Sequence, residues 1–199
     1  MELALERTAV DGLISGVKKL HETHAGLQDF IDWPKDMVCA DVEHFAHPSI
    51  PLFENDPHIQ SGPYTNLIGS LRAVSRQAAW RETYKGTPLF DQIMHRFGCF
   101  EIIGYDGFMR SNQMRSFMVY MPPGFHYPWH EHPAEQLYLV LSGEATFQQQ
   151  GQPARRVTPG ETVYHASGIP HATTTTDQPV VCYVLWRNHF DTPPVWSPT

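Results

Sequence analysis

Apolar residues in the first part of the chain recur every three or four positions. From residue 2 to about residue 30 they alternate with polar residues at this spacing, which is typical of an amphipathic helix. The pattern predicts one or two helices that end before Pro34. The same spacing over residues 66–84 predicts a further helix, closed off by Pro88. Between them, residues 34–64 show no period and several prolines, which predicts a long ordered loop with short turns.

From about Phe97 onward, the pattern changes to short apolar runs bounded by Gly and Pro. Short strands at such spacing predict a mainly β fold, a small barrel or sandwich. We therefore expect residues 1–110 to form an N-terminal helical region packed on a β-barrel of residues 111–199, as one structural domain overall. The runs that predict strands are CFEIIGY, MRSFMVYMP, EQLYLVLSG, EATFQQQG, ETVYHASG and VVCYVLW.

Composition narrows the class of protein. A chain of 199 residues with 41% apolar and 18% charged residues fits one globular domain with a full core. The net charge of −7 argues against nucleic acid or an anionic membrane as a partner. Cys39, Cys99 and Cys182 are far apart and odd in number, which suggests neither a disulfide framework nor a zinc ribbon. With no long apolar run and no basic, apolar leader, we expect a cytoplasmic protein.

One stretch concentrates residues that can bind a metal. It reads GFHYPWHEHPAEQLYLVLSG, from Gly124 to Gly143. Side chains alternate across a strand, so His130 and His132 should point the same way. By the same rule Gln136 and Tyr138 share a face. If the barrel interior receives the two histidines, Gln136 is best placed to join them.

A third histidine follows in a second glycine-bounded stretch, GETVYHASGIPHATTTT. There His171 opens an expected strand that runs through Thr173 and Thr175. Three neutral imidazoles with oxygen donors suit one divalent first-row transition metal ion such as zinc, iron, nickel or manganese. A histidine pair alone is more often structural than a metal site. The prediction of a metal site therefore depends on the spacing of the glycines and histidines in both stretches together.

That spacing resembles the cupin signature, G-x5-H-x-H-x3,4-E-x6-G followed by G-x5-P-x-G-x2-H-x3-N. Three slots depart from it, with Gln136 for the glutamate, Ala166 for the proline and Thr175 for the asparagine. The resemblance covers roughly the last ninety residues and implies a cupin β-barrel, a jelly roll. The matching positions are Gly124, His130, His132, Gln136, Gly143, Gly160, Ala166, Gly168, His171 and Thr175.

A narrower resemblance lies in WHEHPAEQLY, which looks like the WHxHxxxExY motif of the cupin-type dimethylsulfoniopropionate lyases of the DddQ kind. Those enzymes cleave their substrate, a small sulfonium zwitterion, to dimethyl sulfide and acrylate. We expect a monomer or homodimer without nucleic-acid or membrane partners. It implies metal-shell positions at His132, Gln136, Tyr138 and His171, and substrate-binding positions at Tyr127, His130 and Trp186.

The implied reaction is chemically reasonable for these residues. β-Elimination needs a base for the proton alpha to the carboxylate, and Tyr138 is the candidate for this catalytic role. Its phenol has an ordinary pKa of about 10, so it becomes a usable base only where a metal or nearby groups stabilise the phenolate. The sulfonium is a bulky cation that suits aromatic faces such as those of Tyr127 and Trp186.

Gln136 leaves alternatives open. An amide is a weaker ligand than a carboxylate, so the chain is either a natural variant or one altered to lower activity. A β-bulge could instead turn Glu135 inward, against strand alternation. The general signature also permits another metal-dependent cupin enzyme, a dioxygenase or isomerase. A non-enzymatic sensor or binding module is the third hypothesis, for which Gln136 is the best argument.

Overall fold

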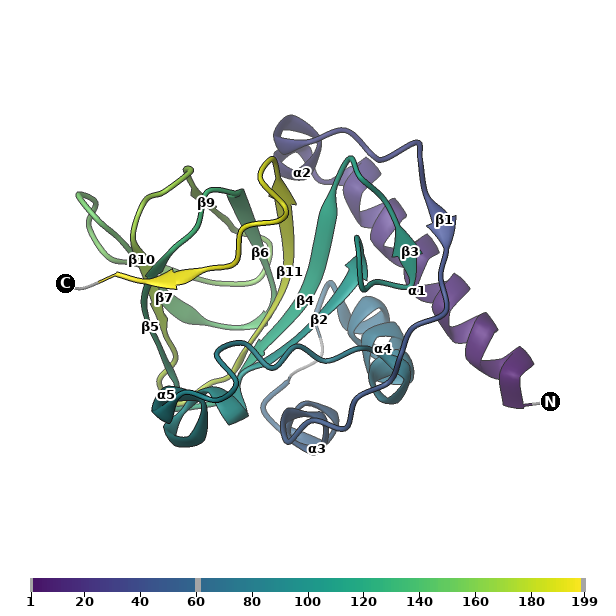
Figure 1. The fold of residues 1–199 in the computed structure, drawn as a ribbon, viewed down its shortest axis with the longest axis horizontal. Helices are drawn as coiled ribbons and strands as arrows, with labels where there is room; N and C mark the ends of the chain where they lie inside the picture. Colours follow the sequence, from purple (N-terminus) through teal and green to yellow (C-terminus); the bar gives the residue numbers. More distant parts are fainter. Residues whose placement is uncertain (1, 60–61, 198–199) are drawn as a thin grey trace.

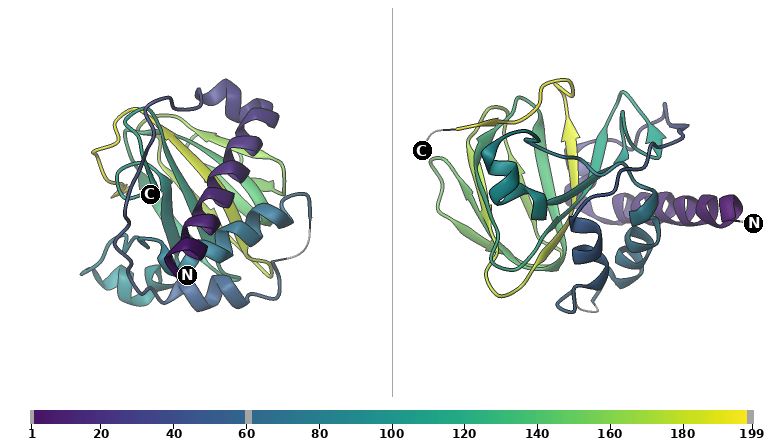
Figure 2. Two further views of the ribbon diagram at one scale, coloured as in Figure 1. Left: turned by 90° about the vertical axis from the view of Figure 1, so that its right-hand side faces the viewer. Right: turned by 60° about the horizontal axis from the view of Figure 1, so that its bottom comes forward.

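The computed structural model describes residues 2–59 and 62–197. A β-barrel forms one side of the molecule, and helices cover the outer face of one of its sheets on the other side (Figures 1 and 2). The predicted mainly β fold with an N-terminal helical region is confirmed. The helices are α1 (Glu2–Thr23), α2 (Ala25–Phe30), α3 (Ser49–Asn55), α4 (Thr65–Val74) and α5 (Pro88–Gln92), with short 3-10 turns η1 (Ser75–Gln77) and η2 (Met94–Arg96).

Two sheets make up the β structure. The seven-stranded sheet has the order β1-β3-β2-β4-β11-β6-β9, and the five-stranded sheet has the order β12-β5-β10-β7-β8. Every run that the sequence predicts as a strand contains one. The strands are β1 (Val38–Cys39), β2 (Gly98–Ile103), β3 (Met109–Arg110), β4 (Arg115–Met121), β5 (His126–Glu131), β6 (Glu135–Gly143), β7 (Ala145–Gln149), β8 (Arg155–Val157), β9 (Thr162–His165), β10 (His171–Thr174), β11 (Val180–Arg187) and β12 (Val195–Trp196).

The larger sheet is buried on both faces, which explains its unbroken apolar runs. Along β6, Leu137 and Leu139 pack with the helices in one core, whereas Tyr138 and Val140 belong to the core inside the barrel. Helix α1 supplies buried side chains to the first core and lies against α4 (Figure 2). The alternation of side chains along β6 therefore divides the two cores and directs the side chains of the site inward.

Two predictions about the N-terminal half need correction. Residues 34–64 are not only loop, because α3 forms within them. The helix predicted over residues 66–84 stops early: α4 ends at Val74 and a 3-10 turn ends at Gln77. Trp80 instead makes an isolated antiparallel bridge to Phe100 of β2. The apolar spacing of this stretch fits an extended segment as well as a helix, and the edge of β2 decides between them.

Strand pairing crosses the expected division at residue 110. Strand β2 precedes that residue and pairs over most of its length with β4, which follows it. A division of the chain into residues 1–110 and 111–199 stays a prediction. Within the described ranges, no helix has both the length and the apolar character needed to cross a membrane.

Candidate metal and substrate site

Two neighbouring strands bring the predicted histidines together. Strand β10 pairs antiparallel with β5, and His171 stands opposite His130 in that register. His132 lies just after β5, where its carbonyl oxygen accepts a hydrogen bond from the backbone N–H of Gly168 at 2.9 Å. Gly168 has a φ of +69°, which a residue without a side chain adopts at little cost. The turn before β10 is thereby fastened to the end of β5.

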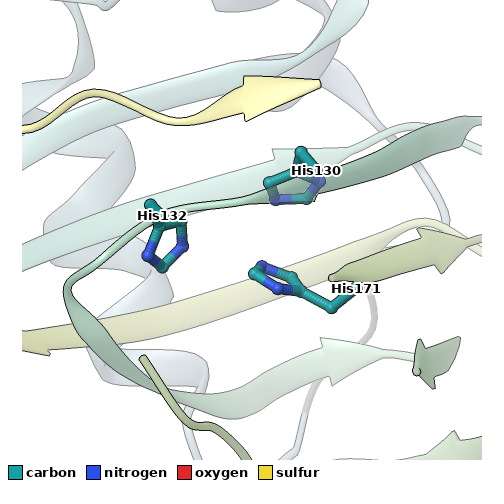
Figure 3. A group of neighbouring side chains, drawn as sticks. All are labelled: His130, His132 and His171. Carbon is teal, nitrogen blue, oxygen red and sulfur yellow. The ribbon is translucent and has the colours of Figure 1, made fainter. Parts of the chain in front are cut away.

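The three imidazoles lean toward one point inside the barrel (Figure 3). Ring centroids are 4.2 Å apart for His130 and His171, 5.1 Å for His132 and His171, and 6.2 Å for His130 and His132. One ligand atom from each ring lies within 4.8 Å of the others, and all three side chains are buried. The convergence predicted from strand alternation is observed, and its spacing can hold one metal ion.

Local hydrogen bonds set the tautomer of each ring. In every case Nδ1 lies 2.8 to 2.9 Å from a backbone carbonyl oxygen two residues away. A carbonyl oxygen only accepts, so Nδ1 carries the hydrogen and Nε2 carries the free lone pair. The Nε2 atoms of His132 and His171 are buried with no hydrogen-bond partner in the described structure. Buried nitrogens of this kind, oriented by a backbone carbonyl, fit the role of metal ligands. The three carbonyls belong to Pro128, Ala134 and Ile169.

Burial keeps these rings neutral. Desolvation lowers the pKa of His130 to about 4 and places the pKa of His171 well below its ordinary value. The pKa of His132 is lowered for the same main reason. Because a metal binds the neutral imidazole, the site is ready to accept an ion without first losing protons at neutral pH.

A fourth buried histidine, His165, joins the group and was missed by the sequence predictions. It lies on β9 opposite Gln136 of β6 and stacks on His171 with ring centroids 4.1 Å apart. Neither ring nitrogen has a hydrogen-bond partner among the described residues, and burial lowers its pKa to about 3. Strand alternation in the run TVYH, which sets His165 on the face of Val163, was the signal that could have found it.

Gln136 and Tyr138 face the barrel interior, as predicted. Gln136 is buried, and its Oε1 has no hydrogen-bond partner in the part of the chain that the structure describes. Both side chains line the same pocket as His130 and His132. Burial raises the pKa of Tyr138 well above its ordinary value. An unpartnered amide oxygen beside neutral imidazoles adds an oxygen donor to the group, although a neutral one.

Glu135 points away from the site, so the alternative with an inward bulge is not what the structure shows. Its carboxylate accepts hydrogen bonds from Arg187 at 2.8 and 2.9 Å, from Tyr164 at 2.5 Å and from Asn188 at 3.0 Å. Arg187, followed by Tyr164, lowers the pKa of this carboxyl to about 2. The carboxylate is thus held on the outer side of β6, and Gln136 occupies the inward position.

Tyr127 and Trp186 lie against the histidines. Tyr127 stacks on His130 with ring centroids 3.9 Å apart, and Trp186 lies 4.5 Å from His132. Both line the pocket. The pocket also contains residues that the sequence predictions did not name, and strand parity on β4 and β11 was the signal available for three of them. The added residues are Arg81, Thr83, Phe97, Cys99, Phe117, Val119, Val184 and Pro194.

Another departure from the cupin signature has a structural reason. Thr175 donates a hydrogen bond to Pro122 O at 2.6 Å and accepts one from Phe125 N at 2.9 Å. These bonds fasten the segment before β5, which carries His130. A hydroxyl therefore performs a positioning task in the slot where the signature has an amide side chain.

Comparisons with known proteins agree with this geometry. A family model described as dimethylsulfoniopropionate lyase matches residues 19–182. The chain is 38% identical over 187 residues to dimethylsulfoniopropionate lyase DddQ of Ruegeria pomeroyi, with 94% of this chain and 93% of that protein covered.

Solved structures show the same likeness over nearly the whole chain. The crystal structure of DddQ from Ruegeria pomeroyi DSS-3 matches with a TM-score of 0.92 at 38% identity, covering 96% of each chain. A structure described with the DMSP lyases RdDddP and RnDddQII matches with a TM-score of 0.90 at 32% identity, covering 97% of this chain and 100% of that one. The barrel carries both histidine motifs of the cupin-like signature, and the chain belongs to the dimethylsulfoniopropionate lyase family.

Proposed function

We propose that this protein cleaves dimethylsulfoniopropionate to dimethyl sulfide and acrylate by β-elimination. The observation that carries the proposal is the group of three buried imidazoles, each with Nδ1 hydrogen-bonded to a backbone carbonyl so that Nε2 carries the lone pair. This group opens onto a pocket with aromatic walls. Family membership indicates the substrate.

The proposed metal shell consists of His132, Gln136, Tyr138 and His171, with His130 close beside it. Buried neutral imidazoles and two oxygen donors fit one divalent transition metal ion such as zinc, iron, nickel or manganese. Such an ion would supply Lewis acidity toward the substrate carboxylate and so acidify the neighbouring Cα–H. The fit rests on the donor set and on the unpartnered nitrogens of His132 and His171.

Tyr138 is the proposed base. In the reaction its oxygen takes the proton from the carbon alpha to the carboxylate, and the electron pair of that bond forms the new carbon–carbon double bond. The bond from the beta carbon to sulfur breaks with its electrons going to sulfur, so dimethyl sulfide leaves neutral. Because burial raises the pKa of this phenol, its phenolate requires positive charge nearby.

Aromatic side chains form the proposed seat for the sulfonium. Tyr127 and Trp186 lie against two of the histidines, and Phe117 packs edge-on to Trp186 at 5.4 Å. Aromatic faces attract a desolvated organic cation by about 0.5 to 2 kcal/mol each. An apolar wall also keeps water away from the reacting bond.

Headspace measurement of dimethyl sulfide from the purified protein, combined with elemental analysis, tests the proposal. We expect release that stops when a chelator removes the metal and returns when a divalent ion is restored. A metal-loaded protein that releases no dimethyl sulfide would refute the lyase assignment.

The second candidate, a non-enzymatic metal-binding module, is favoured by Gln136, because an amide ligand weakens the expected centre. The cytoplasmic location and the monomeric or dimeric state stay predictions.

A further inference from the structure

Arg81 lines the pocket beside the histidines, although it lies outside the two histidine-containing motifs of the sequence. The bridge between Trp80 and Phe100 places both rings in the core under the helices. The next residue along the chain, Arg81, donates its backbone N–H to Cys99 O at 2.8 Å. Since neighbouring residues of an extended segment point to opposite faces, Arg81 lies on the side of Cys99, whose thiol belongs to the barrel core.

Among the described residues, no carboxylate forms an ion pair with Arg81. Its guanidinium lies over the Phe117 ring, 5.2 Å from the ring centroid. Arg115 lies over the same ring at 5.2 Å but is bound to the buried carboxylate of Glu101. Of the two arginines on Phe117, Arg81 therefore keeps a free guanidinium.

Arg81 also stands where two cavities meet. The pocket beside the histidines is small, about 40 Å³, and an outer cleft of about 740 Å³ lies next to it. Arg81, Thr83 and Pro194 line both, so they form the neck between the cleft and the pocket. Because the inner pocket is small, a substrate that touches the histidines also extends to this neck.

Arg81 is the permanently charged side chain among the described residues that line the inner pocket, since the histidines there are neutral. A guanidinium repels a sulfonium and binds a carboxylate through two parallel hydrogen bonds. We propose that Arg81 binds the carboxylate of the substrate, and of the acrylate product, at the neck of the pocket. Each carboxylate oxygen keeps a second lone pair, which can face the proposed metal site.

The charged residues of the outer cleft affect how the substrate is oriented as it enters. Asp41, Glu43 and Asp106 line the outer cleft, so it attracts the sulfonium end, whereas Arg81 attracts the carboxylate end. Opposite charges at the two sides of the neck steer a zwitterion during entry, and once it is bound its sulfonium lies on the aromatic faces of Tyr127 and Trp186. The assignment as a substrate-carboxylate site rests on the proposed lyase function. The carboxylate chemistry of Arg81 can be tested apart from it.

Binding of acrylate and of uncharged acrylamide is measured by calorimetry on the metal-stripped and metal-loaded protein. Arg81→Met keeps an apolar stem over Phe117 and should weaken acrylate binding about tenfold or more, ~1.4 kcal/mol, with acrylamide binding unchanged. Arg81→Lys should lie between, because it keeps the charge but not the fork. Arg110→Gln is the matched control: Arg110 lines the outer cleft but not the inner pocket, and its loss should leave acrylate binding as it was.

Kinetics on the lyase reaction complete the test. For Arg81→Met, KM for dimethylsulfoniopropionate should rise about tenfold or more, and inhibition by acrylate should weaken in parallel. Unchanged acrylate binding and unchanged KM in Arg81→Met would overturn the proposal, and if that variant does not fold, the same result in Arg81→Lys with an intact melting transition would do so. If the unaltered protein releases no dimethyl sulfide but binds acrylate through Arg81, the lyase function fails while the carboxylate site stands.

Discussion

His130 and His171 lie opposite each other in adjacent antiparallel strands, with ring centroids 4.2 Å apart. The register of β5 and β10 therefore sets the distance between two of the three nitrogens that can hold an ion. Each ring is held by a hydrogen bond from Nδ1 to the carbonyl of its own segment. Backbone carbonyls hold these two imidazoles in place. Neighbouring side chains can therefore be substituted without disturbing the orientation of the rings.

Restoring a carboxylate at position 136 should strengthen the metal centre. Gln136→Glu should raise affinity for a divalent ion at least about tenfold, because an anionic ligand gains Coulomb attraction that an amide lacks. Dimethyl sulfide release should rise with it. Competition with a chelator measures the affinity, and headspace analysis measures the release.

Glu135→Gln is the matched control for that change. Glu135 is held outside the barrel by Arg187, so its loss should leave metal affinity unaltered. If Glu135→Gln empties the site while Gln136→Glu has no effect, the carboxylate ligand is Glu135 and the inward position of Gln136 is not the one that matters.

Tyr138→Phe should lower turnover by about 10²- to 10⁴-fold, the range for loss of a general base. Metal content and the melting transition should change little, because the ring stays in the barrel core. Tyr164→Phe is the control, since Tyr164 is exposed on β9 and bonds to Glu135. Turnover close to normal in Tyr138→Phe would mean that another group takes the proton.

Stability of the metal-stripped protein should fall as the pH drops below neutral. The unfolded chain takes up protons on histidines near their ordinary pKa of 6.5, whereas in the folded state burial lowers the pKa of His130 to about 4 and that of His165 to about 3. The stabilisation by neutral burial is complete above pH 6.5 and is lost as the pH falls toward these folded values. Each such histidine adds a slope of up to about 1.4 kcal/mol per pH unit.

Denaturant unfolding between pH 7 and 5 measures this slope, in a range where most carboxyl groups remain ionised. His165→Gln removes one of the buried imidazoles and should make the dependence of the unfolding free energy on pH shallower. An equal slope in the two proteins would show that His165 titrates alike in the folded and unfolded chain.

Gly143→Ala should destabilise the fold by more than about 1 to 3 kcal/mol, the cost of a strained backbone alone. Gly143 has a φ of +69°, and an added Cβ would lie 1.8 Å from Pro179 O. Gly151→Ala separates the two effects, because Gly151 has a φ of +77° with open space around its Cβ position. If both variants lose the same unfolding free energy, the clash with Pro179 O does not contribute to the destabilisation.

Local sequence patterns were enough to predict the first helices and the direction of several side chains in the site. The helical spacing of the first thirty residues predicted α1 and α2, which are confirmed. Strand alternation predicted that His130 and His132 share a face and that Gln136 turns inward while Glu135 turns out. These predictions hold because side-chain direction within one strand depends only on sequence parity, and because apolar residues on one face must be buried.

Other features depended on which distant segments pack together. The end of α4 at Val74 follows from the bridge between Trp80 and Phe100, and apolar spacing by itself fits either structure. His165 enters the histidine group because β9 pairs with β6. Arg81 lines the pocket because its segment lies along β2, more than fifteen residues away in the chain. Pairing across such separations is decided by the packing of the whole barrel, so only the tertiary structure could place these side chains.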